Sequence, residues 1–314
     1  MARILVTGAG GFIGRALCSG LAARGHRVIA GLRRGLSQGA PPIEGGEPRI
    51  LGEIAPGRDW SGVLGDVDIV IHLAQRAHRR AAGEALAGEP EAAAAVARGI
   101  ARAGGRRLLY MSSIKAMGEA TPPGRRFCAD DPPRPEDAYG RAKLASERAL
   151  AEIADETGLE LVILRPPLVY GPRVGGNFRA LVRLSASGLP LPFAALDNRR
   201  SLIFLDNLVD LVAEAALHPA APGRVVLAAD GTDLSTPALI RILARGQDRE
   251  ARLFALPDLV FAALRRLPGL GPVVSRLSLS LQVDDGATRA LLGWSPRVAA
   301  EAGLALTARA VAAR

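Results

Sequence analysis

The stretch that decides the fold is Thr7-Gly8-Ala9-Gly10-Gly11-Phe12-Ile13-Gly14, a glycine-rich turn near the start of the chain. An apolar run at 3–7 precedes it and an alanine- and leucine-rich run at 12–24 follows it, which predicts a strand, a turn and a helix. Glycines at 8, 11 and 14 let the backbone turn tightly, approach a pyrophosphate and pack the helix on the sheet. The turn therefore predicts a dinucleotide site, and the residues expected to line it are Gly8, Gly10, Gly11, Phe12, Ile13 and Gly14.

Short apolar runs continue to alternate with helical stretches along the chain. We expect further strands at 27–32, 68–73, 107–112 and 160–165, and helices at 91–103 and 139–157. This alternation is typical of a parallel sheet with helices on both faces. Beyond residue 165 the chain is richer in Pro and Gly, with longer connections. The sequence thus predicts an α/β fold, with a Rossmann-type doubly wound parallel sheet in residues 1–165. Residues 166–314 are expected to form mostly a smaller substrate-binding lobe, with some elements returning to the first domain.

The charge balance is basic, with 40 Lys and Arg against 31 Asp and Glu in 314 residues and a formal net charge of +9. Such an excess raises the possibility of a nucleic-acid partner. The arginines are scattered, however, and no basic block is interleaved with aromatic residues as a strand-binding groove would require. A basic surface also attracts a cofactor or substrate that carries a diphosphate. We therefore expect no nucleic-acid partner.

Cysteine content and hydropathy indicate a cytoplasmic protein. Cys18 and Cys128 cannot build a disulfide framework and lack metal-ligand spacing. The N-terminus has no signal-peptide layout, and no apolar run reaches membrane-spanning length. Prolines and charges interrupt the apolar segment 253–281, which supports at most a covered or membrane-grazing helix. His72 and His78 have no carboxylate partners nearby in the sequence, so we expect no metal site.

The residues after the strand at 27–32 bear on the choice of cofactor. NAD-preferring sites usually place Asp or Glu there to bind the ribose 2′-hydroxyl. This chain has Gly31-Leu32-Arg33-Arg34-Gly35, which contains no carboxylate. Guanidinium groups make charge-assisted contacts with the 2′-phosphate of NADP. Arg33 and Arg34 therefore favour NADP. A solvated arginine pair stays open as the other interpretation, with NAD as the alternative cofactor.

A tyrosine and a lysine lie four residues apart at the start of the helix expected at 139–157. At this spacing Tyr139 and Lys143 share one helix face. A phenol titrates near pH 10, and a neighbouring ammonium favours the phenolate and moves its pKa toward neutrality. Ser112 and Ser113 end the strand at 107–112, where a hydroxyl can bind a substrate carbonyl. This constellation predicts acid–base proton transfer at a substrate carbonyl oxygen.

Together these motifs resemble those of the extended short-chain dehydrogenase/reductases over nearly the whole chain, and most closely the nucleotide-sugar epimerases, dehydratases and ketoreductases. The segments that carry the resemblance, besides the glycine turn and the Tyr139/Lys143 pair, are 72–74, 112–115, 164–172, 177–178, 198–201 and 292–296.

The resemblance implies a role for individual residues. Ser113 would bind the reacting oxygen, with Ser112 as the less favoured choice, Tyr139 would move the proton, and Lys143 would tune it and hold the nicotinamide ribose. The cofactor would also contact Glu53, Ile54, Leu73, Ala74 and Pro166. The sugar diphosphate or the sugar itself would contact Lys115, Asn177 and Arg200. A purely structural role for Arg200 stays open as the alternative. Tyr170 would form a wall of the active site.

One feature departs from the pattern of these relatives. They often carry Asn where the helix before the strand at 107–112 begins, and here the region reads Gly88-Glu89-Pro90-Glu91. A proton relay that uses such an Asn is therefore in doubt for this chain.

The resulting hypothesis is NADPH-dependent reduction of a nucleotide 4-ketosugar, with UDP as the expected nucleotide. The alternative is a UDP-sugar 4-epimerase of an N-acetylhexosamine or hexose, which would retain NAD tightly. A third hypothesis, from a different class, is a non-catalytic NADP-binding regulator; the presence of both Tyr139 and Lys143 disfavours it. A homodimer through the Tyr139 helix and its neighbour is expected from the resemblance alone.

Overall fold

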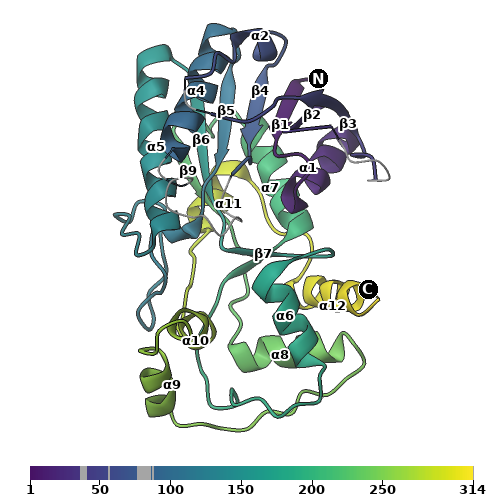
Figure 1. The fold of residues 1–314 in the computed structure, drawn as a ribbon, viewed down its shortest axis with the longest axis vertical. Coiled ribbons are helices and arrows are strands. Elements are labelled where there is room, and N and C mark those ends of the chain that lie inside the picture. The colour runs from purple at the N-terminus through teal and green to yellow at the C-terminus, as the bar shows by residue number, and fades with distance from the viewer. Residues whose placement is uncertain (36–40, 56, 76–85, 87, 314) are drawn as a thin grey trace.

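The computed structural model describes residues 1–314 except 36–40, 56, 76–85, 87 and 314. Its centre is a parallel sheet in the order β3-β2-β1-β4-β5-β6-β9 (Figure 1). The strands of this sheet are β1 (Arg3–Thr7), β2 (Arg27–Leu32), β3 (Gly46–Ile50), β4 (Ile69–His72), β5 (Arg107–Met111), β6 (Glu160–Arg165) and β9 (Arg224–Leu227). The predicted doubly wound α/β fold is confirmed.

The strands expected at 3–7, 27–32 and 160–165 have the predicted bounds, and β4 and β5 are shorter than expected by one or two residues. β3, which pairs with β2 at the sheet edge, was not predicted. Its sequence, Gly-Glu-Pro-Arg-Ile, is largely exposed and lacks an apolar alternation. Pairing with β2, and not a hydrophobic pattern, defines this edge strand.

Helices cover both faces of the sheet, as Figure 1 shows. On one face α1 (Phe12–Ala23) packs beside α7 (Leu205–Leu217) over a core that includes Ile4, Val6 and Leu208. On the other face α4 (Glu89–Arg102) packs beside α5 (Ala138–Thr157), with the short α2 (Ser61–Leu64) at its edge. Both α7 and β9 follow residue 166 in the chain, yet they pack with the N-terminal elements.

The second lobe lies beyond the carboxyl ends of the strands (Figure 1). Its core joins aromatic and aliphatic side chains such as Tyr170, Phe178, Phe204 and Leu304. Its elements are β7 (Leu168–Tyr170), β8 (Leu202–Phe204), α6 (Gly176–Ser185), α8 (Thr236–Arg245), α9 (Asp258–Leu264), α10 (Gly271–Ser278) and α12 (Ala300–Ala312), while α11 (Gly286–Leu292) returns to the sheet.

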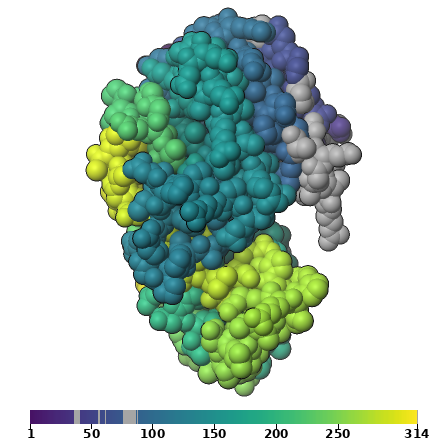
Figure 2. All heavy atoms as spheres, turned by 90° about the vertical axis from the view of Figure 1, so that its left-hand side faces the viewer, coloured from purple at the N-terminus to yellow at the C-terminus, as the bar shows by residue number. Residues whose placement is uncertain are grey.

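The apolar segment at 253–281 forms the two short helices α9 and α10 at the far tip of the second lobe, the yellow-green region of Figure 2. Pro268 and the charged Arg265 and Arg266 lie between the two helices, in line with the interruption by prolines and charges that the sequence suggested. Within the described residues, no helix has both the length and the apolarity that crossing a bilayer requires.

β1 lies at the centre of the sheet, with β2 on one side and β4 on the other. Because the chain winds away from β1 in both directions, the connections after β1 and β4 leave on opposite faces. A crevice at the carboxyl ends is the usual ligand site of such a sheet. The glycine turn follows β1 directly and therefore lies at this point.

Candidate active site

The glycine turn between β1 and α1 is as tight as its sequence predicts. Gly8 has a φ of +70°, and a Cβ there would lie 3.0 Å from the amide nitrogen of Ala74. A Cβ on Gly14 would lie 2.4 Å from the carbonyl oxygen of Gly8. A Cβ on Gly10, by contrast, would meet only the side chain of Leu32, at 3.6 Å. Gly8 and Gly14 thus allow the turn, the neighbouring loop and α1 to approach one another.

The N-terminus of α1 is open to a ligand. Gly11 is its N-cap, and among the described residues no side chain caps the helix and no acidic residue lies in its first turn. Phe12 and Ile13 pack their side chains against the core, and their backbone amides belong to the first turn of α1. An uncapped helix N-terminus carries partial positive charge and favours an anion.

Thr7 ties the loop after β4 to the glycine turn. Its hydroxyl accepts hydrogen bonds from the amides of Leu73 and Ala74, both at 3.1 Å. The same oxygen lies 3.0 Å from Nδ1 of the buried His72. Burial, together with the nearby Lys143, lowers the pKa of His72 to about 3. Leu73 and Ala74 therefore form a fixed wall beside the turn, and a neutral His72 supports it.

No metal centre is visible in the part of the chain that the structure describes, which holds no cluster of three or more potential ligands. His78, considered with His72 in the sequence, lies outside the described residues.

The expected adenosine end of the site lies at the carboxyl end of β2. Arg33 and Arg34 follow β2 directly and are exposed. The Gly31 carbonyl accepts a hydrogen bond from the Ala9 amide at 3.3 Å, so this strand end lies beside the glycine turn. Both guanidinium groups are thus available next to the turn.

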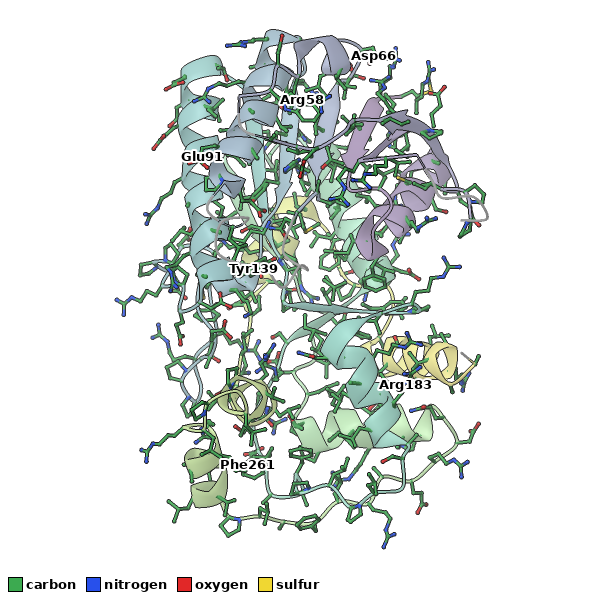
Figure 3. The ribbon with its side chains drawn as sticks, viewed as in Figure 1. Arg58, Asp66, Glu91, Tyr139, Arg183 and Phe261 are labelled. Carbon is green, nitrogen blue, oxygen red and sulfur yellow. The ribbon has the colours of Figure 1, made fainter. Side chains whose placement is uncertain are left out.

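Glu53 and Ile54 follow β3 on the same side of the sheet. Glu53 is exposed, while Ile54 is half-buried against the core under α4. Arg58, labelled in Figure 3, donates to the Glu53 carbonyl at 3.1 Å. Contacts of these residues with a cofactor stay a prediction.

Tyr139 lies in the first turn of α5, between the sheet and the second lobe (Figure 3). Asp137 caps this helix by accepting from the Gly140 amide at 2.7 Å. The Tyr139 hydroxyl donates to Oε1 of Gln75 at 3.2 Å and interacts with the Ser113 hydroxyl. The phenol, Ser113 and Gln75 therefore converge on one point at the carboxyl edge of the sheet.

The titration of Tyr139 differs from our expectation. Burial, and then the charge of Glu89, raise its pKa to about 12, although hydrogen bonds with Gln75 and Ser113 oppose the change. We expected the Lys143 ammonium to lower this pKa. The Lys143 amine does share the helix face with Tyr139, but its hydrogen bonds are with the Tyr110 hydroxyl and the Met111 carbonyl.

Lys143 is fully buried, one turn along α5. Its Nζ donates to the Met111 carbonyl at 2.7 Å and to the Tyr110 hydroxyl at 3.1 Å. It also lies 3.8 Å from Oε1 of Glu89. Burial lowers the pKa of Lys143 to about 7, against the opposing effect of Glu89 and Glu147. The amine thus titrates near neutrality, below the phenol that it was expected to activate.

Ser112 belongs to the core, which corrects its expected role in substrate binding. Its hydroxyl hydrogen-bonds the buried carboxylate of Glu147. Glu147 also accepts from Nε of the buried Arg165 at 3.0 Å. Because the Ser112 hydroxyl already bonds Glu147, Ser113 is the candidate that binds the reacting oxygen.

Ser113 is held in place by the end of β6. It caps the short 3₁₀ turn η1 (Ile114–Ala116), and the Ile114 amide donates to the carbonyl of the buried Pro166 at 2.9 Å. Lys115 points away from this contact and pairs with Glu119 at 2.6 Å and Asp137 at 2.7 Å. Its expected contact with substrate stays a prediction, and would have to compete with two carboxylates.

Asn177 and Arg200, the residues expected to bind the diphosphate, both belong to the second lobe. Asn177 is exposed in the first turn of α6. Arg200 is half-buried and donates to the Leu279 carbonyl at 3.0 Å. Burial lowers its pKa to about 10, so it remains a cation at neutral pH. The structure therefore supplies a backbone anchor for Arg200, and its binding role stays a prediction.

Tyr170 was expected to form a wall of the active site, and the structure corrects this expectation. It is fully buried, and its hydroxyl donates to Asp230 at 2.6 Å. Its ring packs against Phe178 and Phe204 in the core of the second lobe. The apolar strand sequence around it gave no sign of the distant Asp230 partner.

Three residues near the expected catalytic group were missed from the sequence: Gln75, Tyr110 and Glu89. Gln75 follows β4 by three residues and Tyr110 lies within β5, so only the fold brings them to Tyr139 and Lys143. Glu89 opens α4 at the place where relatives often carry Asn, and the sequence showed only the absence of that Asn.

The site fits a nicotinamide dinucleotide. The turn has backbone in place of side chains where a pyrophosphate must approach, and the α1 amides face it. At the other end, Nε2 of Gln75 is buried without a hydrogen-bond partner among the described residues, close to Tyr139. An unpaired buried amide is costly and indicates a ligand at this point.

Comparisons with known proteins agree with this geometry. The chain is 35% identical to a UDP-glucose 4-epimerase of Vibrio cholerae, over 98% of this chain and 94% of that protein. It is 26% identical to a dTDP-6-deoxy-L-talose 4-dehydrogenase (NAD(P)(+)) of Kitasatospora kifunensis, covering 94% and 91% of the two chains. A crystal structure of UDP-glucuronic acid 4-epimerase from Bacillus cereus in complex with NAD superimposes with a TM-score of 0.78 at 21% identity, covering 98% of both chains.

The family model for the NAD dependent epimerase/dehydratase family matches residues 4–228, which hold the whole parallel sheet. This chain is therefore an enzyme and a member of the NAD-dependent epimerase/dehydratase family, within the extended short-chain dehydrogenase/reductases.

Proposed function

We propose that this enzyme reduces the 4-keto group of a nucleotide-linked sugar, with UDP as the nucleotide and NADPH as the reductant. The observation that carries the proposal is the pair Arg33 and Arg34, exposed beside the glycine turn where residues 31–35 contain no carboxylate. Two guanidinium groups favour the 2′-phosphate of NADP, which exchanges between turnovers and supports net reduction. The Kitasatospora relative, named as a dehydrogenase using NAD(P), supports net redox chemistry at C4.

Each residue of the site has a task in this reaction. The bound nicotinamide supplies the hydride. Tyr139 donates its hydroxyl proton to the carbonyl oxygen, and Ser113 donates a hydrogen bond to the same oxygen as negative charge develops on it. A Tyr139 pKa of about 12 keeps the phenol protonated at neutral pH, as an acid requires. Solvent then returns a proton to Tyr139.

The second lobe orients the sugar. Arg200 carries a positive charge that a diphosphate would neutralise, and Asn177 adds a neutral donor at the start of α6. These residues take no part in the chemistry. They fix the distance between the sugar ring and Tyr139.

A 4-epimerase with retained NAD is the second candidate, favoured by the 35% identity with the Vibrio UDP-glucose 4-epimerase. Tyr139 would then take the proton of the C4 hydroxyl while bound NAD supplied the hydride acceptor, and would return that proton once the hydride came back to the opposite face of the sugar. The reductase proposal predicts that the protein is purified with NADP(H) or no nucleotide and that it oxidises NADPH when a UDP-4-ketosugar is added. Tightly held NAD and interconversion of UDP-sugars without consumption of NADPH would refute it.

We also propose that the enzyme acts in the cytoplasm as a homodimer. α4 and α5 lie side by side on one face of the sheet, with exposed residues such as Arg98 and Arg148 on their outer sides. Joining this surface to its copy would give a bundle of four helices. Light scattering of the purified protein tests the assembly, and a mass near 32.7 kDa would contradict it.

A further inference from the structure

Glu89 is a buried carboxylate beside the amine of Lys143. It is the first residue of α4, and 9% of its side chain is exposed. Its Oε1 lies 3.8 Å from Nζ of Lys143, and among the described residues its Oε2 has no hydrogen-bond partner. Burial of a carboxylate is costly unless it is paired. Within the part of the chain that the structure describes, the cation that pairs with Glu89 is Lys143.

The other groups around Lys143 do not supply a comparable charge. Tyr110 from β5 and the Met111 carbonyl accept its hydrogen bonds but are neutral. Glu147 of α5 also raises the pKa of Lys143, but less than Glu89 does, and its charge is paired with that of Arg165. His72 of β4 is neutral at pH 7, and Tyr139 of α5 is protonated. The charge that counters burial of the Lys143 ammonium therefore comes chiefly from α4.

We propose that Glu89 is a positioning residue that keeps Lys143 protonated beside Tyr110 and so sets the upper pH limit of turnover. The consequence for turnover rests on the proposed function, whereas the state of the amine does not. An opposite charge at this distance shifts a titration by roughly 1 to 3 units. Since Lys143 already titrates at about 7, loss of Glu89 would leave it uncharged in the physiological range.

The amine can be observed directly because the chain contains two lysines, Lys115 and Lys143. Protein labelled with ¹³C at lysine Cε would give two signals, which the Lys115→Arg variant assigns. We expect Lys143 to titrate near pH 7 in the wild-type protein. In Glu89→Gln it should titrate at least 1 unit lower, as expected for a lost opposite charge. An unchanged Lys143 titration in folded Glu89→Gln would overturn the proposal.

Matched variants separate charge from packing. Glu91→Gln lies in the same first turn of α4, but Glu91 is exposed, so the Lys143 titration should not change. Figure 3 labels Glu91 away from Tyr139. Glu89→Asp retains the charge and should keep most of the wild-type behaviour. Should Glu89→Gln not fold, the Lys143 titration is measured in Glu89→Ala instead. A fall in the Lys143 pKa that is as large in Glu91→Gln as in Glu89→Gln would also overturn the assignment.

Turnover provides the second measurement. In the holoenzyme with NADPH and a UDP-4-ketosugar, the basic limb of kcat/KM against pH should move to lower pH in Glu89→Gln. At pH values above the basic limbs of both enzymes, kcat/KM of Glu89→Gln should be lower by about tenfold for each pH unit by which its limb has moved. This difference should shrink as the pH falls. A loss that is equal at every pH would contradict a role through the charge of Lys143. If the wild-type enzyme reduces no ketosugar, the proposed function fails, and the lysine titration still decides the role of Glu89.

Discussion

Replacing Gly14 by alanine tests how closely the cofactor site depends on the contact between the glycine turn and α1. The added Cβ would lie 2.4 Å from the Gly8 carbonyl oxygen and 2.7 Å from the Ala9 Cα, both backbone atoms that no rotamer change can move. Ordinary contact requires at least about 3.4 Å, so turn and helix must separate by about 1 Å. Overpacking of this kind costs about 1–3 kcal/mol, which lowers the melting temperature by roughly 2–10 °C.

The same displacement moves the amides that face the dinucleotide. Loss of one charge-assisted hydrogen bond costs about 1.5–3 kcal/mol, so we expect the dissociation constant of NADPH to rise by at least about tenfold. Gly62→Ala is the matched control, because Gly62 lies in α2, outside the site, and its Cβ would meet nothing within 4 Å. Thermal melting and calorimetric titration measure both effects. Wild-type affinity in Gly14→Ala, or equal losses in the two variants, would refute this reasoning.

Three further outcomes follow from contacts elsewhere in the structure. Arg33→Ala combined with Arg34→Ala should raise the KM for NADPH by about tenfold and leave that for NADH nearly unchanged; equal effects on both would contradict the 2′-phosphate role. Glu147→Gln leaves the buried Arg165 without its counter-charge, and urea unfolding should show a loss of about 3–5 kcal/mol. His72 has a pKa of about 3 when folded against 6.5 as its ordinary value, so its contribution to stability is complete above pH 6.5 and is lost as the pH falls toward 3. His72→Gln should therefore reduce the dependence of the free energy of unfolding on pH, measured by urea unfolding between pH 6.5 and 4, by up to about 1.4 kcal/mol per pH unit. An unchanged slope would be inconsistent with a buried neutral imidazole.

The central elements could be predicted because local sequence specifies them. The run at 3–7 is buried on both faces, the following glycines fit only a tight turn, and both signals lie within residues 3–14. β3 could not be predicted, because an exposed edge strand takes its conformation from its partner. The same limit applied to α7 and β9, whose return to the sheet depends on contacts that are distant in sequence. These are the packing of α7 against α1, the pairing of β9 with β6, and the hydrogen bond from Arg107 Nη1 to the His218 carbonyl.

The candidate site was predictable to the same degree. Spacing placed Tyr139 and Lys143 on one helix face, and strand order placed Ser113 near them. The direction of the Lys143 amine was not predictable, since it depends on Tyr110, the Met111 carbonyl and Glu89 from two other elements. Ser112 and Ser113 are adjacent in sequence, and only the buried Glu147 distinguishes the structural hydroxyl of Ser112 from that of the half-buried Ser113.

The most direct test of the account is the effect of Tyr139→Phe on NADPH oxidation with a UDP-4-ketosugar. The ring keeps its packing and loses only the hydroxyl that bonds Gln75. We predict a fall in kcat of about 100-fold or more, because general acid catalysis contributes roughly 10²–10⁴-fold, with NADPH affinity unchanged. Turnover equal to that of the wild-type enzyme would contradict the assignment of this phenol as the proton donor.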